Sequence, residues 1–571
     1  MIISVFSMIL LVGVIMITIS YTCLLLSGKK KAFVAIGHVY QGKEIRKFKQ
    51  APGPHPWPVI GNLDILGRFQ HNPFQGFGAL TKKYGDIYSI TLGHTRCLVV
   101  NNVDLIKEVL NKNGKFLGGR PDFYRYHKLF GGDRNNSLAL CDWSQLQQRR
   151  RNLARRHCSP RESSSYFSKM SEIGGLEINH LLDQLNKMSL VNSFDIKPII
   201  LKASANMFCQ YMCSVRFSYN DYDFQKIIEY FDEIFWEINQ GYSFDFLPWL
   251  LPFYTNHIKK IVHWSTNIRK FILDRIVNRR EIKMNLDEPD KDFTDALLKS
   301  LKEDQNVSRN TIIFMLEDFI GGHSAVGNLV MLALTYIAKN PTIGMLIRQE
   351  VDNVSNRGER RISLYDMNLM PYTMASILEV LRHSSSPIVP HVAMEDTVIS
   401  GYGVIKGTIV LINNYILNMS ENNWNHPDQF EPVRFLEKNY KKNMRSSIKI
   451  NKGTRTIESS DSDEEINEEK YKNGGFNKFI QNKLKENKSP KDRQAFSLKK
   501  NIPHFLPFSV GKRTCIGQNL VKGYGFLLLA NIIQNYNVKC SDFSKINLQK
   551  SSVALPTKCF ELILRPRNSI L

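Results

Sequence analysis

Cysteine is scarce in this 571-residue chain, and the cysteines present are widely scattered. The nine cysteines stand at positions 23, 97, 141, 158, 209, 213, 515, 540 and 559, with no C-x-x-C pair among them. An odd set without paired spacing argues against a disulfide framework and against a zinc site. We therefore expect the folded part of the chain to face the reducing cytosol.

Acidic residues are few relative to basic ones: 53 Asp and Glu stand against 76 Lys and Arg, a formal net charge of +23. Such a charge suits nucleic acid, but no run of Lys and Arg interleaved with aromatic residues marks a binding strip, so we expect no nucleic-acid partner. An anionic membrane surface or an acidic redox partner fits the charge better. No internal repeat is visible, and 43% hydrophobic residues allow a large core.

Charge is absent from the first 26 residues, which are nearly all apolar. At ~1.5 Å per residue, a helix of this length spans a bilayer. Because Lys29, Lys30 and Lys31 follow the apolar run instead of preceding it, the pattern predicts an uncleaved signal anchor over residues 1–27. The positive-inside rule then predicts a single-pass protein of the endoplasmic reticulum membrane with its folded part in the cytosol.

Four prolines within residues 52–58 make the segment after the anchor rigid. Prolines at every second position exclude a helix, so we interpret the basic and proline-rich stretch 28–58 as a linker that ends in a polyproline-like strap. Residues 59–571 are predicted to form one folded domain.

The pattern over this domain is mainly helical with a small β part. Residues 87–92 alternate apolar and polar side chains, as a half-buried strand does. From about Val103 to Arg382, apolar residues recur at three- and four-residue spacing, most clearly in 311–338 and 372–382, and predict helices. A short strand-rich stretch follows at about 398–411.

One segment of the domain, residues 437–500, breaks this pattern. It holds 17 Lys and Arg and 10 Asp and Glu, a net charge of +7, with Asn, Ser and Gly at about half of the other positions. Such a composition buries too little apolar surface to fold, so we expect most of it to be a disordered charged insertion.

A loop near the C-terminus, Phe508 to Gly517, is built to offer a thiolate. Cys515 stands between Gly511 and Gly517, with Arg513 two residues before it. Positive charge and backbone N–H groups favour a deprotonated sulfur, and the apolar run 518–534 predicts a helix whose N-terminus adds to this effect. The alternative is an inert cysteine buried at a helix start.

The pattern F-x-x-G-x-R-x-C-x-G resembles the haem-binding loop of the cytochromes P450. The resemblance covers residues 51–565 apart from the insertion. It implies a cytochrome P450 fold behind the transmembrane helix, haem b with Cys515 as the axial iron ligand, and Phe508, Gly511 and Gly517 around it. It further implies O₂ chemistry with electrons from NADPH through a cytochrome P450 reductase.

A second motif of the family is a buried charge triad. Glu379-x-x-Arg382 places a carboxylate and a guanidinium at i,i+3 on one helix face, and Arg434 follows within Phe430 to Phe435. By the resemblance, these three residues lock the haem loop to the core and have a structural role.

Haem propionates need cationic or N–H donors. The resemblance implies Trp143, His391 and Arg513 as such donors. The family usually has Arg four residues after the Trp, where this chain has Gln147. Arg150 lies seven residues on, nearly two turns and so on the same face, and is our predicted substitute.

The segment Ile320 to Val326 departs from the family pattern (A/G)-G-x-(D/E)-T, whose acid and alcohol deliver protons during oxygen activation. Aligning its glycines puts Ala325 and Val326 at the positions of the acid and the threonine. His323 and Ser324 are the nearest polar groups and are our candidates for a proton relay. A helix kink with His323 bonded only to backbone is an equal alternative.

The family also implies which residues face the substrate, although apolar residues at such positions are often plain core. The predicted pocket residues are Ile320, Gly321, Gly322, Pro387, Ile388 and Val389. A pocket lined in this way suits a lipid or a sterol.

Two further segments, 141–144 and 150–160, are similar to those of the insect Spook/Spookier group of cytochromes P450. This resemblance implies a monooxygenase that oxidises a sterol in an early step of ecdysteroid synthesis from 7-dehydrocholesterol. Because the acid–alcohol pair is missing, a haem-thiolate isomerase or dehydratase, or a steroid-binding haem protein without O₂ activation, remains an alternative.

Overall fold

The computed structural model describes residues 13, 18, 33–36, 46–69, 73–188, 193–285, 287–303, 308–385, 388–438, 496–546, 548 and 552–567. The predicted anchor 1–27 lies outside the described residues, apart from two isolated positions. Most of the first part of the linker and most of the charged insertion lie outside them as well.

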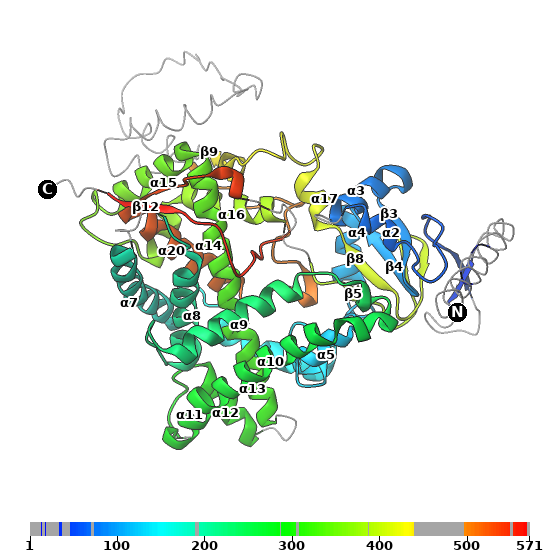
Figure 1. Cartoon of the computed structure of the whole chain (residues 1–571), viewed down its shortest axis with the longest axis horizontal. Coiled ribbons are helices and arrows are strands. Elements are labelled where there is room, and N and C mark those ends of the chain that lie inside the picture. The colour runs from blue at the N-terminus through cyan, green and yellow to red at the C-terminus, as the bar shows by residue number, and fades with distance from the viewer. Residues whose placement is uncertain are drawn as a thin grey trace, which may run out of the picture.

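Helices form most of the described chain; most of the longer ones gather at one side of the molecule, and several short ones lie near the strands at the other side (Figure 1). The longer ones are α3 (Pro73–Tyr84), α6 (Gln145–Cys158), α7 (Ser165–Met188), α8 (Lys197–Cys213), α9 (Tyr222–Ile238), α10 (Thr255–Ile272), α12 (Phe293–Glu303), α13 (Arg309–Ile320), α14 (Gly322–Lys339), α15 (Pro341–Val354), α16 (Pro371–Ser384) and α20 (Gln518–Asn535). The shorter ones are α2 (Leu63–Gly67), α4 (Val103–Lys107), α5 (Tyr124–Leu129), α11 (Asn278–Lys283) and α17 (Asn414–Met419).

The core is centred on α14, which packs against α8 and α20. Nearly every residue from Val326 to Ala338 is buried, as expected for a helix that is apolar on all sides. Residues 309–339 are long and apolar enough to cross a membrane, yet 83% of the apolar window is buried inside the protein. We therefore regard α13 and α14 as core helices.

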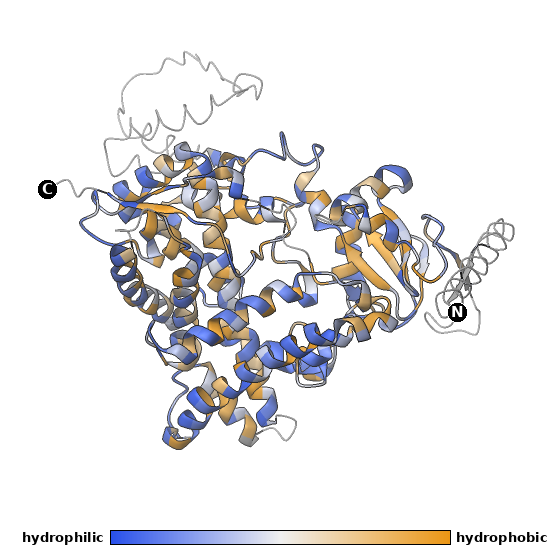
Figure 2. Cartoon of the chain, in the orientation of Figure 1, coloured by the Kyte–Doolittle hydropathy of each residue, from blue (hydrophilic) through white to orange (hydrophobic). Residues whose placement is uncertain are grey.

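Two four-stranded sheets lie at the side of the molecule away from α14, whereas the two-stranded sheet of β11 (Tyr536–Lys539) and β12 (Ile563–Pro566) lies on the helical side and contacts α14 (Figure 1). One sheet has the order β3 (Ile87–Leu92), β4 (Thr95–Val100), β8 (Ile409–Ile412) and β5 (His391–Val392); another has the order β1 (Phe33–Ile36), β2 (Arg46–Lys49), β7 (Tyr402–Val404) and β6 (Thr397–Ile399). Strand β3 has the predicted bounds, and its residues alternate between buried and half-buried. Figure 2 shows the apolar character of this sheet.

The end of the predicted linker is part of the fold. Strand β2 pairs in parallel with β7 through Lys49 and Tyr402, and the Ser89 hydroxyl of β3 donates to the Ala51 carbonyl at 2.8 Å. The boundary predicted at residue 58 was therefore too late, because the proline strap lies against the sheet instead of spanning open space.

The ends of the predicted insertion are also ordered. Strand β9 (Leu436–Lys438) pairs antiparallel with β10 (Phe496–Leu498), and Leu436 lies opposite Leu498. The insertion 437–500 was thus predicted too wide at both ends; residues 439–495 lie outside the described residues. For the residues that the structure describes, the predicted fold class, mainly α with a small β part, is confirmed.

Candidate active site

A cavity of about 390 Å³ lies between the cysteine loop, α13, α14 and the segment before β5. Its lining includes seven of the residues predicted for the site: Gly322, Ile388, Val389, Phe508, Arg513, Cys515 and Gly517. The remaining lining is mostly apolar and includes Leu138, Phe235, Phe319, Leu329, Leu381 and Val553. The structure therefore brings residues far apart in the sequence around one apolar space.

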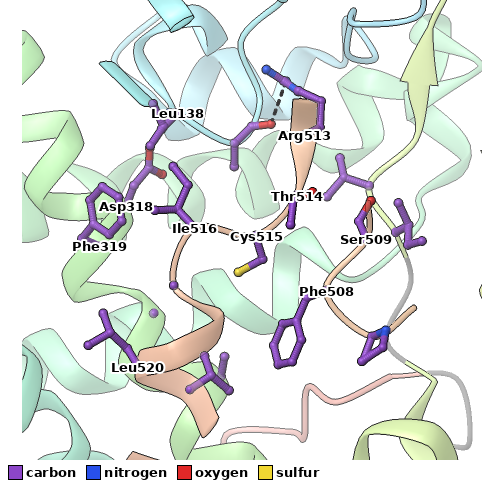
Figure 3. Close-up of a pocket in the computed structure, with 18 of the residues that line it drawn as sticks. Leu138, Asp318, Phe319, Phe508, Ser509, Arg513, Thr514, Cys515, Ile516 and Leu520 are labelled. Atoms are coloured by element: carbon purple, nitrogen blue, oxygen red, sulfur yellow. Dashed lines mark hydrogen bonds between the residues drawn. The ribbon is translucent and has the colours of Figure 1, made fainter. Parts of the chain in front are cut away.

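Cys515 opens onto this cavity from the segment before α20 (Figure 3). Its surroundings are deep in the protein, so burial raises the pKa of the thiol, while the Gly517 N–H and the charges of Arg151 and Lys522 lower it. Helix α20 begins at Gln518, three residues after the cysteine, as predicted. The sulfur is thus accessible from the cavity, where a bound ligand would contact it.

Arg513 does not supply the positive charge that we expected beside the thiolate. Its Nη2 donates to the carbonyls of Cys141, at 2.5 Å, and Ala139, at 3.2 Å, in the loop before α6, as Figure 3 shows for one of these bonds. Arg151 and Lys522 supply the charge instead. Arg513 stands two residues before Cys515, and its side chain points toward a different wall of the cavity from the one that carries the sulfur.

The two glycines predicted beside Cys515, Gly511 and Gly517, have different roles. Gly517 lines the cavity. Gly511 does not; it has a φ of +75°, and a Cβ there would lie 2.3 Å from the Leu110 carbonyl oxygen. Gly511 is therefore required by its backbone conformation and by the close approach of the loop to residues 108–112.

Donors without partners surround the Arg513 side of the cavity. Among the described residues, Arg513 Nη1 and Arg151 Nε are buried without a hydrogen-bond partner, and no carboxylate lies within ion-pair distance of Arg120, Arg151 or Arg513. Burial and then the charge of Arg513 lower the pKa of Arg120. An anionic group such as a haem propionate would satisfy this excess of donors.

Arg150, our predicted substitute for the family arginine, lies elsewhere. Its guanidinium donates to the Asn135 carbonyl and to the Thr311 hydroxyl, whereas the neighbouring Arg151 lines the cavity and donates to the Thr514 carbonyl. The prediction was thus one residue early. Trp143 lies outside the lining, with the Lys512 ammonium 5.4 Å above its ring.

His391 is buried in β5. Its Nδ1 bonds to the Leu117 carbonyl at 2.7 Å, which leaves Nε2 unpartnered. Burial and the nearby Arg120 and Arg513 lower the pKa of His391 well below its usual range, so the ring is neutral. Its one proton lies on Nδ1, which donates to the Leu117 carbonyl, and Nε2 is therefore an acceptor.

The helix opposite the cysteine presents Gly322, Ala325 and Leu329 to the cavity. Val326 is fully buried in the core, so our alignment of Ala325 and Val326 with the acid and the alcohol was one residue late. Counting the motif from Gly321-Gly322 puts Ser324 at the position of the acid and Ala325 at that of the alcohol. The cavity-facing position thus has no hydroxyl group.

Neither candidate for the proton relay reaches the cavity. His323 is fully buried, its Nδ1 bonds to the Ile320 carbonyl at 2.6 Å, and its ring packs edge-on against Phe231. Burial lowers the pKa of His323 to about 4. The Ser324 hydroxyl is buried without a partner. The geometry matches the alternative in which His323 bonds only to the backbone.

The predicted substrate residues divide between the cavity and the core. Gly322, Ile388 and Val389 line the cavity, whereas Ile320 and Gly321 do not. Pro387 lies outside the described residues. On α13 the lining residues are Asp318 and Phe319, because the helix faces the cavity along a different stripe than expected.

The charge triad is fully assembled. Arg382 donates from Nε and Nη2 to the two Glu379 oxygens at 2.7 Å each, and Arg434 Nε donates to Glu379 Oε1 at 3.1 Å. Arg382 also donates to the Asn418, Pro427 and Gln429 carbonyls. These bonds tie α16 to the segment that leads to β9.

Sequence reasoning missed Arg120, Arg151, Asp318 and Val553. A signal existed for Arg120, which stands in the distinctive run Gly118-Gly119-Arg120-Pro121. Its guanidinium bonds to the carbonyls of Ala139, Val389 and Pro390, and so joins three walls of the cavity. Val553 had no local signal, because a single valine in an irregular segment is common.

A mainly helical fold with a cysteine facing an apolar cavity, unpaired cationic donors beside it and a Glu–Arg–Arg triad defines a haem-thiolate protein. The cytochrome P450 family model matches residues 51–449 and 482–564. The chain therefore belongs to the cytochrome P450 family, whose members are monooxygenases with thiolate-ligated haem and electrons from a reductase.

Individual relatives agree with this assignment. The chain is 58% identical to cytochrome P450 307a1 of Drosophila melanogaster over 557 residues, 96% of each protein. It is 28% identical to cytochrome P450 1A1 of Sparus aurata, covering 85% of this chain and 84% of that one, and 25% identical to cytochrome P450 1B1 of Mus musculus, covering 96% and 93%. The strong match to an insect protein agrees with the predicted resemblance to an insect group.

Proposed function

We propose that the protein is a sterol monooxygenase of the endoplasmic reticulum membrane that acts in an early step of ecdysteroid synthesis from 7-dehydrocholesterol. The observation that carries this proposal is the apolar cavity of about 390 Å³ against Cys515. The similarity to an insect cytochrome P450 supports it, because the resemblance found in the sequence is to an insect group with this activity.

The protein's own residues divide the work at this site. Cys515 would hold the haem iron, while Arg151 and Arg513 would bind its propionates through their unpartnered N–H groups. Arg120 lines the same side of the cavity, and His391 would bind a propionate only as an imidazolium, because Nδ1 holds the one proton of the neutral ring. When bound there, haem supplies O₂ activation. The apolar side chains exclude water and orient the substrate, and the Glu379 triad keeps the cysteine loop against the core.

Proton delivery follows an unusual route in this proposal. Ala325 faces the cavity where the family has an alcohol, and His323 and Ser324 point elsewhere. Ordered water or a hydroxyl group of the substrate would then deliver the protons, in place of the side-chain relay.

The partners in this proposal are NADPH–cytochrome P450 reductase, the membrane and the sterol. The net charge of +23 suits an acidic reductase surface and anionic lipids. Residues 1–27 would supply the single membrane anchor, with the haem domain in the cytosol.

A second candidate follows from the missing hydroxyl at position 325. A haem-thiolate isomerase or dehydratase, or a steroid-binding haem protein, needs no proton relay for oxygen activation. Dependence on NADPH and reductase separates these activities from a monooxygenase.

The decisive experiment combines the purified protein with reductase, NADPH and a panel of sterols, and determines the product structures. We expect oxygenated product only with NADPH, and a ferrous–CO complex with the red-shifted Soret band typical of thiolate ligation. Cys515→Ser should lose both the band and turnover. Product formed without NADPH would favour the isomerase, and an unchanged CO spectrum in the variant would exclude Cys515 as the ligand.

A further inference from the structure

A carboxylate faces the otherwise apolar part of the cavity. Asp318, in the last turns of α13, is the one acidic residue in the lining that the structure describes. It shares a face of the helix with Gly322, Ala325 and Leu329, and Figure 3 shows it beside Leu138 and Phe319. The other charged lining residues are the arginines 120, 151 and 513, which bond to backbone carbonyls.

The Asp318 carboxylate is held in place but keeps acceptor capacity. Its Oδ2 accepts from the Leu138 N–H at 2.5 Å and its Oδ1 from the Ser137 hydroxyl at 3.2 Å. A carboxylate has about four acceptor sites, so each oxygen can take a further hydrogen bond. No cation lies within ion-pair distance of Asp318 among the described residues.

Keeping an acid at this position is costly for the fold. Burial raises the pKa of Asp318 to about 7, against the two hydrogen bonds from residues 137 and 138. Leucine or valine would complete the apolar lining without this desolvation cost. A buried polar group in an apolar pocket commonly fixes the orientation of a ligand.

Asp318 is poorly placed to act as the missing proton donor. It precedes Ala325 by seven residues, about 10 Å along the helix axis. A polar group bound by Asp318 would therefore lie well away from the position at which the family motif places the proton-delivering alcohol.

We propose that Asp318 is a specificity-determining residue that accepts a hydrogen bond from a hydroxyl group of the substrate and so sets the orientation of the sterol in the cavity. This inference rests on the proposed sterol activity. It adds the ligand chemistry that the site selects: an apolar ring system with a hydroxyl group at the end remote from the oxidised carbon.

The test uses the purified holoenzyme and two ligands, 7-dehydrocholesterol and its 3-deoxy analogue. Their dissociation constants are measured from the change in the haem absorption spectrum. We expect the wild type to bind the hydroxylated sterol about tenfold or more tightly than the deoxy analogue, as one hydrogen bond to a charged group predicts. Asp318→Leu should bind the two ligands equally.

Two variants separate recognition from structure. Ser137→Ala removes a hydrogen bond to Asp318 but leaves the carboxylate, so the preference for the hydroxyl group should remain. Asp318→Asn is nearly isosteric and decides the question if the leucine variant fails to load haem: its preference should fall by several-fold.

The outcomes distinguish the two proposals. If the sterols bind and are oxidised but the variants keep the full preference for the hydroxyl group, the role of Asp318 is overturned and the sterol activity stands. If neither sterol binds to the wild type, the proposed sterol activity is overturned, and the role of Asp318 with it.

Discussion

At the residue scale, the side chains at positions 323 to 325 explain why water or the substrate, and not a side chain, would deliver protons at this site. Ala325 presents only a methyl group to the cavity. The His323 ring bonds to the backbone of α13 and packs against Phe231 of α9, and the Ser324 hydroxyl is buried outside the cavity lining. A group that cannot reach the cavity cannot deliver a proton there.

We therefore predict that Ser324→Ala, His323→Ala and the double variant retain coupled turnover when rates are normalised to haem content. The measurement is product formed per NADPH consumed, with peroxide assayed in parallel. A positioned general acid contributes ~10²–10⁴-fold, so a loss of that size with diversion of NADPH to peroxide would reinstate the side-chain relay.

The same scale shows why part of the site could not be read from the sequence. Cys515, Phe508 and the triad are fixed by local motifs, and the sequence identified them. Arg150 and Arg151 differ by about 100° around α6, as do Ala325 and Val326 around α14. Which of the two neighbours faces the cavity depends on how each helix is rotated about its axis when it packs. The local sequence pattern does not determine that rotation.

At the element scale, the triad joins α16 to the segment that carries Arg434, and its three members are nearly or wholly buried. Removing one partner from such a cluster leaves an uncompensated buried charge, which costs ~3–5 kcal/mol. The cation–π contacts of Arg382 and Arg434 with the Trp424 ring further stabilise the connection between α16 and the segment that carries Arg434.

Arg434→Leu is accordingly expected to lower the free energy of unfolding by ~3–5 kcal/mol and to reduce haem content, measured by thermal unfolding and by the ratio of haem to protein absorbance. Arg68→Leu is the matched control, because its pair with Asp64 is largely exposed and is worth at most ~1 kcal/mol. Equal effects of the two substitutions would contradict a structural role for the triad.

Helices and strands were predicted well where the local spacing of apolar residues determines their type. The alternation of residues 87–92 defines β3, and the apolar runs define α14, α16 and α20. Strand β2 and the pair β9 and β10 escaped prediction. The sequences of β2 and β9 are charged, β10 has only three residues, and the strand conformation of all three depends on partners remote in the chain.

At the scale of the whole molecule, the charged segment between β9 and β10 contributes basic charge. Residues 441–491 hold 13 Lys and Arg and 8 Asp and Glu, a net charge of +5. We expect a variant without these residues to keep its haem content and to unfold at a similar or slightly higher temperature. Shortening the connection from 57 to six residues changes its closure entropy by only about 2 kcal/mol, in favour of the folded state.

Binding of the deletion variant to vesicles with anionic lipids should weaken, since basic charge is lost. Circular dichroism melting, haem absorbance and vesicle sedimentation measure these expectations. Loss of haem incorporation in the variant would instead mean that the segment contributes to the folded core.

The pairing of β9 with β10 has a practical consequence. Adjacent antiparallel strands bring their ends to within about 5 Å of each other, so a connection of a few residues can join Lys438 to Phe496 without moving either strand. The connection is an internal attachment point: a fluorescent protein or affinity tag whose own termini lie close together could replace residues 441–491. Such a label would report on the enzyme in living cells while leaving both chain ends untouched.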